Sequence, residues 1–95
     1  MAKGYIIASV TVTNPEAYAR YAKASSEAIA LYGVKVLVRA GRCEALEGNI
    51  RQRNIVLEFE SYKAAQAYYH SPEYTAARAL RKDAADVSFM LVEGV

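Results

Sequence analysis

The sequence predicts an α+β fold in the order β-α-β-β-α-β, which builds a four-stranded antiparallel sheet with helices on one face. Three features predict this fold. Four short runs are rich in β-branched and aromatic residues, alanine-rich segments between them favour helix, and helix-start motifs precede those segments. Because the chain has 95 residues, 54% of them hydrophobic, we expect one domain over residues 1–95 with a single core.

The first strand and the first helix are predicted by alternation and by capping residues. The run Tyr5–Val12 has the period-2 pattern of a strand. Asn14, Pro15 and Glu16 then supply an N-cap, a proline at the first helical position and an early carboxylate. Gly33 predicts the end of this helix, because a left-handed residue is favoured at that position.

A hairpin is expected next. Val34–Ala40 predicts the second strand, and Arg53–Phe59, with its β-branched centre, predicts the third. Gly41 indicates a bend or bulge, after which Cys43–Leu46 could continue the second strand. The turn chemistry of Glu47-Gly48-Asn49 places the tip of the hairpin there.

The register of this hairpin decides which charged residues meet. If the turn is centred at residues 47–49 without a bulge, Arg39 lies opposite Glu58 on the neighbouring strand. An exposed cross-strand pair of opposite charges stabilises a sheet by at most about 1 kcal/mol. The two residues could line a cleft and bind an anionic group or relay a proton, and the alternative is a structural ion pair.

The last third of the chain predicts two helical pieces and a final strand. Ser61 is placed as an N-cap. Pro72 cannot continue a helix and pushes Ser71 out of the α region, so a second piece starts there. We therefore expect a corner at Ser71 between pieces that run from Ser61 to about Ala84, and a fourth strand at Val87–Val92. The result is the ferredoxin-like βαββαβ arrangement.

The predicted strands are apolar on both faces, although helices cover only one face. Adjacent apolar pairs occur in each strand: Ile6-Ile7, Val36-Leu37, Val56-Leu57 and Met90-Leu91. A large uncovered apolar face usually marks a partner. We therefore expect a homodimer in which two helix-free sheet faces pack together, and the sequence leaves open which side chains form that face.

Composition excludes several kinds of partner and cofactor. A net charge of +2 is too small to indicate nucleic-acid or membrane-surface binding. The lone Cys43 has no metal-ligand companions, and there is no glycine-rich phosphate loop, so we expect no metal or other cofactor. The sequence shows no signal peptide and no run long enough to cross a bilayer, and we expect a reducing cytoplasm.

Motifs along almost the whole chain resemble one known family. They are Gly4-Tyr5, Asn14-Pro15-Glu16, Tyr32-Gly33, Leu46-Glu47-Gly48, Glu58-Phe59 and Tyr69-His70-Ser71-Pro72-Glu73-Tyr74. Together they resemble the bacterial domain-of-unknown-function family 1330, and the Ser-Pro-Glu-Tyr run is the most specific of them. Members often carry Asp in place of Asn14, which keeps the cap, and Trp in place of Tyr68.

The resemblance implies membership of the dimeric α+β barrel superfamily, which agrees with the homodimer expected from strand patterning. That superfamily includes cofactor-free monooxygenases, isomerases, haem enzymes and proteins with no known activity, so the resemblance supplies no reaction. We expect a small-molecule cleft in each subunit, with cofactor-free proton transfer or oxygenation of a small organic compound. The alternative is a non-catalytic dimeric binding or assembly module.

The candidate catalytic residues are His70, the only histidine, and Glu58. Imidazole titrates near neutrality and can act as a general base, and the structural alternative is a histidine at an exposed helix end. The candidate ligand-binding residues are Arg39, Tyr18, Tyr21, Tyr68, Ser71 and Tyr74. Tyrosines, here together with Tyr32 and Tyr69, offer an apolar ring and a hydroxyl that orients a ligand. The alternative for them is ordinary helix-on-sheet packing.

Overall fold

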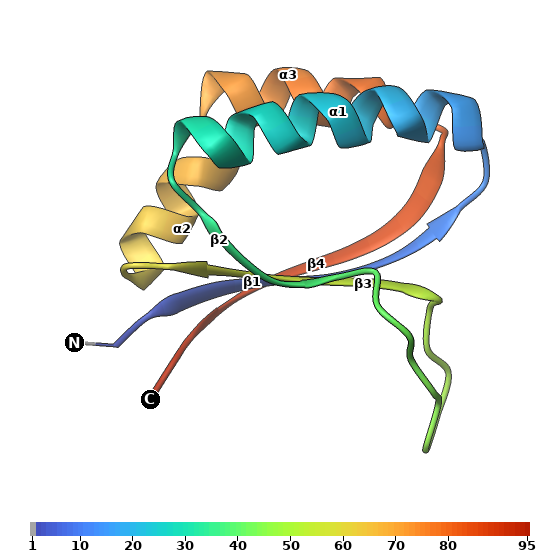
Figure 1. Cartoon of the computed structure of the whole chain (residues 1–95), viewed down its shortest axis with the longest axis horizontal. Coiled ribbons are helices and arrows are strands. Elements are labelled where there is room, and N and C mark those ends of the chain that lie inside the picture. Colours follow the sequence, from blue (N-terminus) through green and yellow to red (C-terminus); the bar gives the residue numbers. More distant parts are fainter. Residues whose placement is uncertain (1) are drawn as a thin grey trace.

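The structure is a computed structural model that describes residues 2–95. Its elements are β1 (Gly4–Val12), α1 (Pro15–Leu31), β2 (Lys35–Arg39), β3 (Arg53–Phe59), α2 (Tyr62–Tyr69), α3 (Pro72–Leu80) and β4 (Ala85–Glu93). The strands form one antiparallel sheet in the order β2-β3-β1-β4. Helices cover one face of this sheet, with α1 beside α3 (Figure 1). The predicted ferredoxin-like α+β fold is confirmed.

The predicted helix starts are confirmed by their hydrogen bonds. The side chains of Asn14, Ser61 and Ser71 each accept a backbone N–H of the first helical turn, at 3.2, 3.0 and 3.1 Å. Each bond satisfies a donor that the helix itself leaves free. Gly33 has a φ of +62° just after α1, so the predicted left-handed stop is also confirmed.

The core fills the space between the helices and the sheet. Gly4 allows the start of α2 to approach β1, because a Cβ at this position would lie 2.3 Å from the carbonyl oxygen of Ser61. The largest buried side chains at the centre are Tyr68, Tyr74, Ile6 and Val10. Together with Tyr18 and Tyr21 of α1, these side chains form one core cluster between the helices and the sheet.

The second strand is shorter than predicted and carries a bulge. Val36 is paired with Leu57 but Val38 with Val56, so one extra residue is inserted at Leu37. Ala40 then adopts a left-handed φ of 51° and turns the chain out of the sheet. The expectation that Cys43–Leu46 continues β2 is wrong, because residues 41–50 form no strand and are exposed.

The predicted Arg39–Glu58 pairing is also wrong, because β2 and β3 pair in a different register, in which the partner of Arg39 is three residues away from Glu58. Arg39 is paired with Ile55, and Lys35 is the residue opposite Glu58. Because successive side chains of a strand point to opposite faces, an insertion of one residue moves every later side chain to the other face. Arg39 consequently points to the helix side of the sheet, while Glu58 lies on the helix-free side.

The helix-free face has an apolar centre. One continuous row crosses all four strands, because consecutive members of the row are paired in register: Val38, Val56, Ile7 and Met90. Met90 is 51% exposed and Val38 40% exposed. The loop of residues 40–52 projects to this same side, away from the helices (Figure 1), and its Leu46 is 84% exposed.

Candidate functional site

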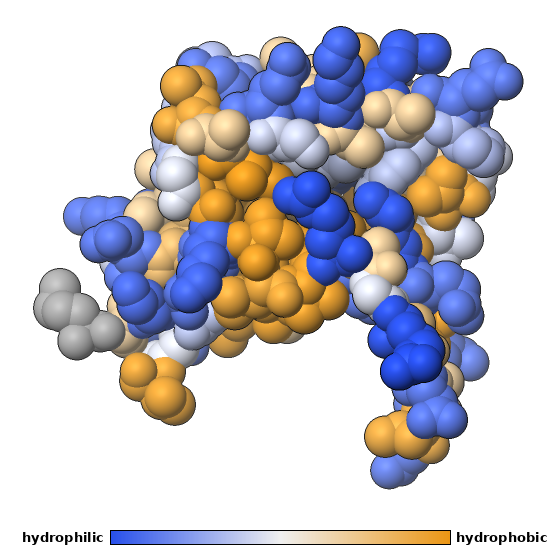
Figure 2. Space-filling view, in the orientation of Figure 1, coloured by the Kyte–Doolittle hydropathy of each residue, from blue (hydrophilic) through white to orange (hydrophobic). Residues whose placement is uncertain are grey.

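A cavity of about 160 Å³ lies between α1 and the sheet. Its lining comes from every strand and every helix: Ile6, Ala8, Tyr18, Tyr21, Ala22, Ser25, Ser26, Ile29, Arg39, Arg53, Ile55, Leu57, Tyr68, Tyr74 and Phe89. Figure 2 shows apolar surface gathered in a hollow beneath the helices, with hydrophilic side chains at its edge. A cavity of about 150 Å³ holds benzene, so this one admits a molecule with a single small ring.

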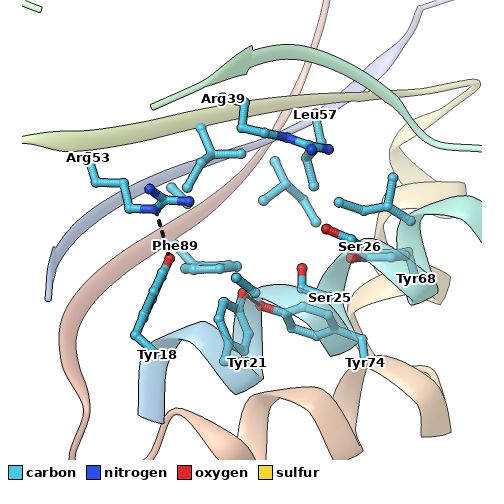
Figure 3. Close-up of a pocket in the computed structure, with 15 residues that line it drawn as sticks. Tyr18, Tyr21, Ser25, Ser26, Arg39, Arg53, Leu57, Tyr68, Tyr74 and Phe89 are labelled. Atoms are coloured by element: carbon cyan, nitrogen blue, oxygen red, sulfur yellow. Dashed lines mark hydrogen bonds between the residues drawn. The ribbon is translucent and has the colours of Figure 1, made fainter. Parts of the chain in front are cut away.

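Two arginines reach the cavity from the sheet. Figure 3 shows Arg39 and Arg53 extended from β2 and β3 toward the side chains of α1. The Nε of Arg53 donates to the hydroxyl of Tyr18 at 3.2 Å, and its guanidinium lies 5.2 Å from the centroid of that ring. The lining contains both guanidinium groups but no aspartate, glutamate or histidine. The charge of the cavity wall is therefore positive and has no counter-charge within the lining.

The opposite wall carries a chain of hydrogen bonds. The hydroxyls of Tyr21 and Tyr74, from α1 and α3, lie 2.6 Å apart. Behind them, Nη1 of Arg81 donates to the hydroxyl of Tyr74 at 3.0 Å. Arg81 is only 8% exposed, and its guanidinium lies between two rings, 5.0 Å from Tyr21 and 4.7 Å from Phe89. A third cation is thus buried directly behind the cavity wall.

Tyr68 contributes a hydroxyl that is buried without a partner. The residue is 1% exposed, and its hydroxyl makes no hydrogen bond within residues 2–95. Burial raises the pKa of Tyr68 to about 12, and the hydroxyl of nearby Ser25 opposes this rise without meeting hydrogen-bond geometry. A buried hydroxyl without an acceptor costs stability, so this group is available to a ligand.

Tyr18 and Tyr74 are also held in their neutral form. Burial raises the pKa of Tyr18, while the hydrogen bond from Arg53 lowers it by a smaller amount. Burial and the neighbouring Tyr21 raise the pKa of Tyr74 far above its ordinary value, against the charge of Arg81. At neutral pH these hydroxyls therefore keep their protons and can act as hydrogen-bond donors.

Ser71 positions this wall and does not line the cavity. Its hydroxyl donates to the carbonyl oxygen of Tyr68 at 2.7 Å and accepts the N–H of Tyr74 at 3.1 Å. The side chain is buried, so both hydrogen bonds are protected from water. The predicted corner at Ser71 is confirmed, and it fixes the two tyrosines that face the cavity from α2 and α3.

His70 and Glu58 both lie outside the cavity lining. They are also on opposite sides of the sheet, because His70 belongs to the helix layer and Glu58 to the helix-free face. His70 is the exposed C-cap of α2, with its ring 5.2 Å from that of Tyr69. Glu58 is half-buried on the helix-free side and accepts a hydrogen bond from the hydroxyl of Tyr5 at 3.1 Å. Of the predicted site residues, the structure gathers Arg39, Tyr18, Tyr21, Tyr68 and Tyr74 around one cavity. The catalytic roles of His70 and Glu58 stay predictions.

Sequence reasoning missed two arginines of this site. Arg53 begins β3, and period-2 alternation from Leu57 and Ile55 would have placed it on the helix-facing side. Arg81 lies in a basic segment, Arg78–Lys82, that resembles a solvated helix end. No signal in the sequence distinguishes it from its neighbours, because only tertiary packing buries it.

Residues 2–95 contain no cluster of three or more His, Cys, Asp or Glu side chains that could hold a metal ion. Within the same residues, no helix is long and apolar enough to span a membrane.

The raised pKa of Tyr68 predicts a loss of stability in alkali. The folded state holds this proton up to about pH 12, whereas the unfolded state releases it near pH 10. Between these values the unfolded state binds fewer protons, so the free energy of unfolding falls as pH rises. The free energy of unfolding, measured in urea at pH 9, 10 and 11, should therefore fall less with pH in Tyr68→Phe than in the wild type.

The matched control is Tyr62→Phe, because Tyr62 is exposed at the start of α2. The free energy of unfolding of this variant should fall with pH as it does in the wild type. At pH 7, Tyr68→Phe should unfold at a urea concentration equal to or above that of the wild type, because it removes an unpaired buried hydroxyl. An unchanged pH slope in Tyr68→Phe would contradict the assignment.

Solved structures share this fold over nearly the whole chain. A protein of unknown function from Rhodopseudomonas palustris is 20% identical with a TM-score of 0.76, covering 99% of this chain and 83% of that one. A dimeric ferredoxin-like protein of unknown function from Thermobifida fusca is 16% identical with a TM-score of 0.67, covering 99% and 92%.

Another solved structure is a candidate antibiotic biosynthesis monooxygenase from Nitrosomonas europaea. It is 13% identical with a TM-score of 0.61, covering 99% of this chain and 90% of that one. At these identities the likeness shows the fold alone. No curated protein is significantly similar to the chain.

The family assignment rests on sequence. The profile of the domain of unknown function DUF1330 matches residues 3–95, which is nearly the full length. The motifs that carry the resemblance, from Gly4-Tyr5 to Ser71-Pro72-Glu73-Tyr74, all fall within this match. The chain belongs to the DUF1330 family.

Proposed function

We propose that the protein is a homodimer in which each subunit binds a small organic anion in the cavity between α1 and the sheet. The observation that carries the anion site is the pair Arg39 and Arg53 in a lining that contains no acidic residue. A guanidinium binds a carboxylate through charge-assisted, often bidentate hydrogen bonds. In a largely apolar cavity such bonds are stronger than in water.

The open volume of the cavity supports a ligand site over an assembly module. A module that only dimerises would be expected to fill this space with its own side chains, but about 160 Å³ stays open between seven aromatic or hydroxyl-bearing residues and the two arginines. Ligand sites are typically apolar cavities with a few polar groups that converge on the ligand. The described lining has this composition.

The dimer is supported by the apolar row on the helix-free face. The row Val38, Val56, Ile7 and Met90 crosses the whole sheet, and its exposed members would be covered if the same face of a second copy packed on it. The exposed loop of residues 40–52, tethered by a hydrogen bond from Arg51 to Thr11, projects toward the same side. Two solved structures of this fold are described as dimeric.

Oxygenation of the bound anion is the second candidate function. It is supported by two fold neighbours described as candidate monooxygenases. Proton abstraction has less support, because the lining offers no imidazole or carboxylate base. In the proposed reaction, O₂ oxidises a CH₂ group to a carbonyl, with one oxygen atom in the product and the other in water.

An oxygen electrode tests this second candidate. With 2,5-dihydroxyphenylacetate as the probe, whose CH₂ group lies next to an electron-rich ring, O₂ uptake should exceed the uncatalysed rate. Mass spectrometry should find the 2-oxo acid formed from the CH₂ group, because oxidation of the hydroquinone ring to a quinone also consumes O₂. The O₂ uptake should fall to the uncatalysed rate in Arg53→Gln, which removes the anion-binding charge. If O₂ uptake equals the uncatalysed rate although the anion still binds, oxygenation is contradicted and anion binding remains as the proposed function.

The anion site predicts that benzoate binds and that neutral benzamide binds more weakly. Arg39→Gln and Arg53→Gln should each weaken benzoate binding by roughly 10- to 100-fold, the contribution of a hydrogen bond to a charged group. Isothermal titration calorimetry measures both affinities. The control is Arg20→Gln, because Arg20 is exposed on α1 outside the cavity lining. Equal affinity for benzoate in all three variants and the wild type would contradict the site.

The dimer predicts a specific effect of charge on the apolar row. Met90→Lys should give monomers, because dimerisation would bury the new ammonium without a partner. The isolated subunit should still fold, since residue 90 is 51% exposed in it. The control is Leu80→Lys, on α3 and 44% exposed, which should stay dimeric. Analytical ultracentrifugation measures the oligomeric state of each variant. If Met90→Lys is still a dimer, the interface lies elsewhere.

A further inference from the structure

The buried guanidinium of Arg81 has an unusual partner. It is 8% exposed, yet its hydrogen bond goes to the neutral hydroxyl of Tyr74 and not to a carboxylate within residues 2–95. A buried charge is expensive unless it is paired, so such an arrangement calls for a compensating role. The stacking of Arg81 between Tyr21 and Phe89 holds the group in place and fixes the direction in which it donates.

Arg81 sets the direction of the hydrogen-bond chain. A guanidinium only donates, so the oxygen of Tyr74 accepts from it. The proton of Tyr74 is then free to be donated to the oxygen of Tyr21, 2.6 Å away. The order Arg81 to Tyr74 to Tyr21 is the favourable one, because hydrogen bonds in a chain polarise one another from the charged end. The proton of Tyr21 remains for an acceptor in the cavity.

Tyr68 supplies a second donor of the same kind. Its hydroxyl is buried, lines the cavity and has no partner within residues 2–95. Figure 3 shows the hydroxyls of Tyr68, Ser25 and Tyr21 on the helix side of the cavity, facing Arg39 and Arg53 on the sheet side. The cavity therefore has hydrogen-bond donors on two opposed walls, with Phe89 and aliphatic side chains between them.

We propose that the ligand is a small organic acid with a second oxygen that only accepts hydrogen bonds, and that Arg81 is the positioning residue that directs Tyr21 toward this oxygen. The inference rests on the proposed anion site and adds the chemistry of the other end of the ligand. The carboxylate binds Arg39 and Arg53, and a ketone, enolate or phenolate oxygen binds the hydroxyls of Tyr21 and Tyr68. An apolar body of about one ring fills the space between.

The experiment compares two matched pairs of ligands on the 95-residue chain. 3- and 4-acetylbenzoate carry a carboxylate and a ketone oxygen, and 3- and 4-isopropylbenzoate have nearly the same shape without that oxygen. In the wild type, the better-binding acetyl isomer should bind about 3- to 10-fold more tightly than its isopropyl counterpart, the contribution of one neutral hydrogen bond. Calorimetry gives this ratio of affinities.

Variants locate the origin of the ratio. Tyr21→Phe and Tyr68→Phe each remove one donor and should lower the ratio, and the double variant should bring it to about one. Arg81→Gln should lower the ratio while leaving the affinity for the isopropyl acids nearly unchanged, an outcome that general loosening of the fold would not give. Tyr32→Phe is the control, because the Tyr32 hydroxyl is bonded to exposed Glu73 outside this cavity.

Every outcome decides the inference. A wild-type ratio of one, with benzoate binding still dependent on Arg53, overturns the second-oxygen proposal and leaves the anion site standing. If none of these acids binds, both the second-oxygen proposal and the anion site are overturned. A ratio that persists in the Tyr21→Phe, Tyr68→Phe double variant also overturns the inference. If Arg81→Gln does not fold, the tyrosine variants test the donor wall, and Arg81→Met at the same position tests the charge.

Discussion

One extra residue in β2 decides the chemistry of both faces of the sheet. Without the bulge at Leu37, strict alternation would place Val38 under the helices and Arg39 on the open face. With it, Val38 pairs with Val56 on the helix-free side, and Arg39 pairs with Ile55 and reaches the cavity. The same local distortion thus keeps the open face apolar and adds a cation beneath α1. Both the proposed dimer and the proposed anion site depend on this register.

The corner between α2 and α3 has a comparable effect on the other wall of the cavity. Pro72 ends one helix and starts the next, and the hydroxyl of Ser71 bonds to the backbone on both sides. Two short helices can therefore present Tyr68 and Tyr74 to the cavity at different angles, which one straight helix could not do. The conformation of this corner, and not any contact of Ser71 with a ligand, links the most specific motif of the chain to the site.

The sequence predicted what depends on local chemistry and failed where tertiary context decides. Caps such as Asn14 and Ser71 act through neighbouring residues, so the helix starts and the order of elements could be predicted. The bulge at Leu37 has no local signal, and Gly41 drew attention to the wrong position. Burial of Arg81 requires Tyr21 and Phe89 from distant elements. The same limit applies to His70, whose chemistry suggested a role although the fold leaves it exposed.

The positive lining also connects ligand binding to stability. Cations held near one another without a counter-charge raise the free energy of the ligand-free fold, and an organic anion between the two walls offsets that cost. A ligand that binds only the folded state stabilises it in proportion to the logarithm of its concentration over Kd. Tyr68, with its unpaired hydroxyl, contributes to the same balance, since its cost disappears when an acceptor arrives. The features that destabilise the ligand-free fold are therefore those by which the proposed site would select an anion rich in acceptors.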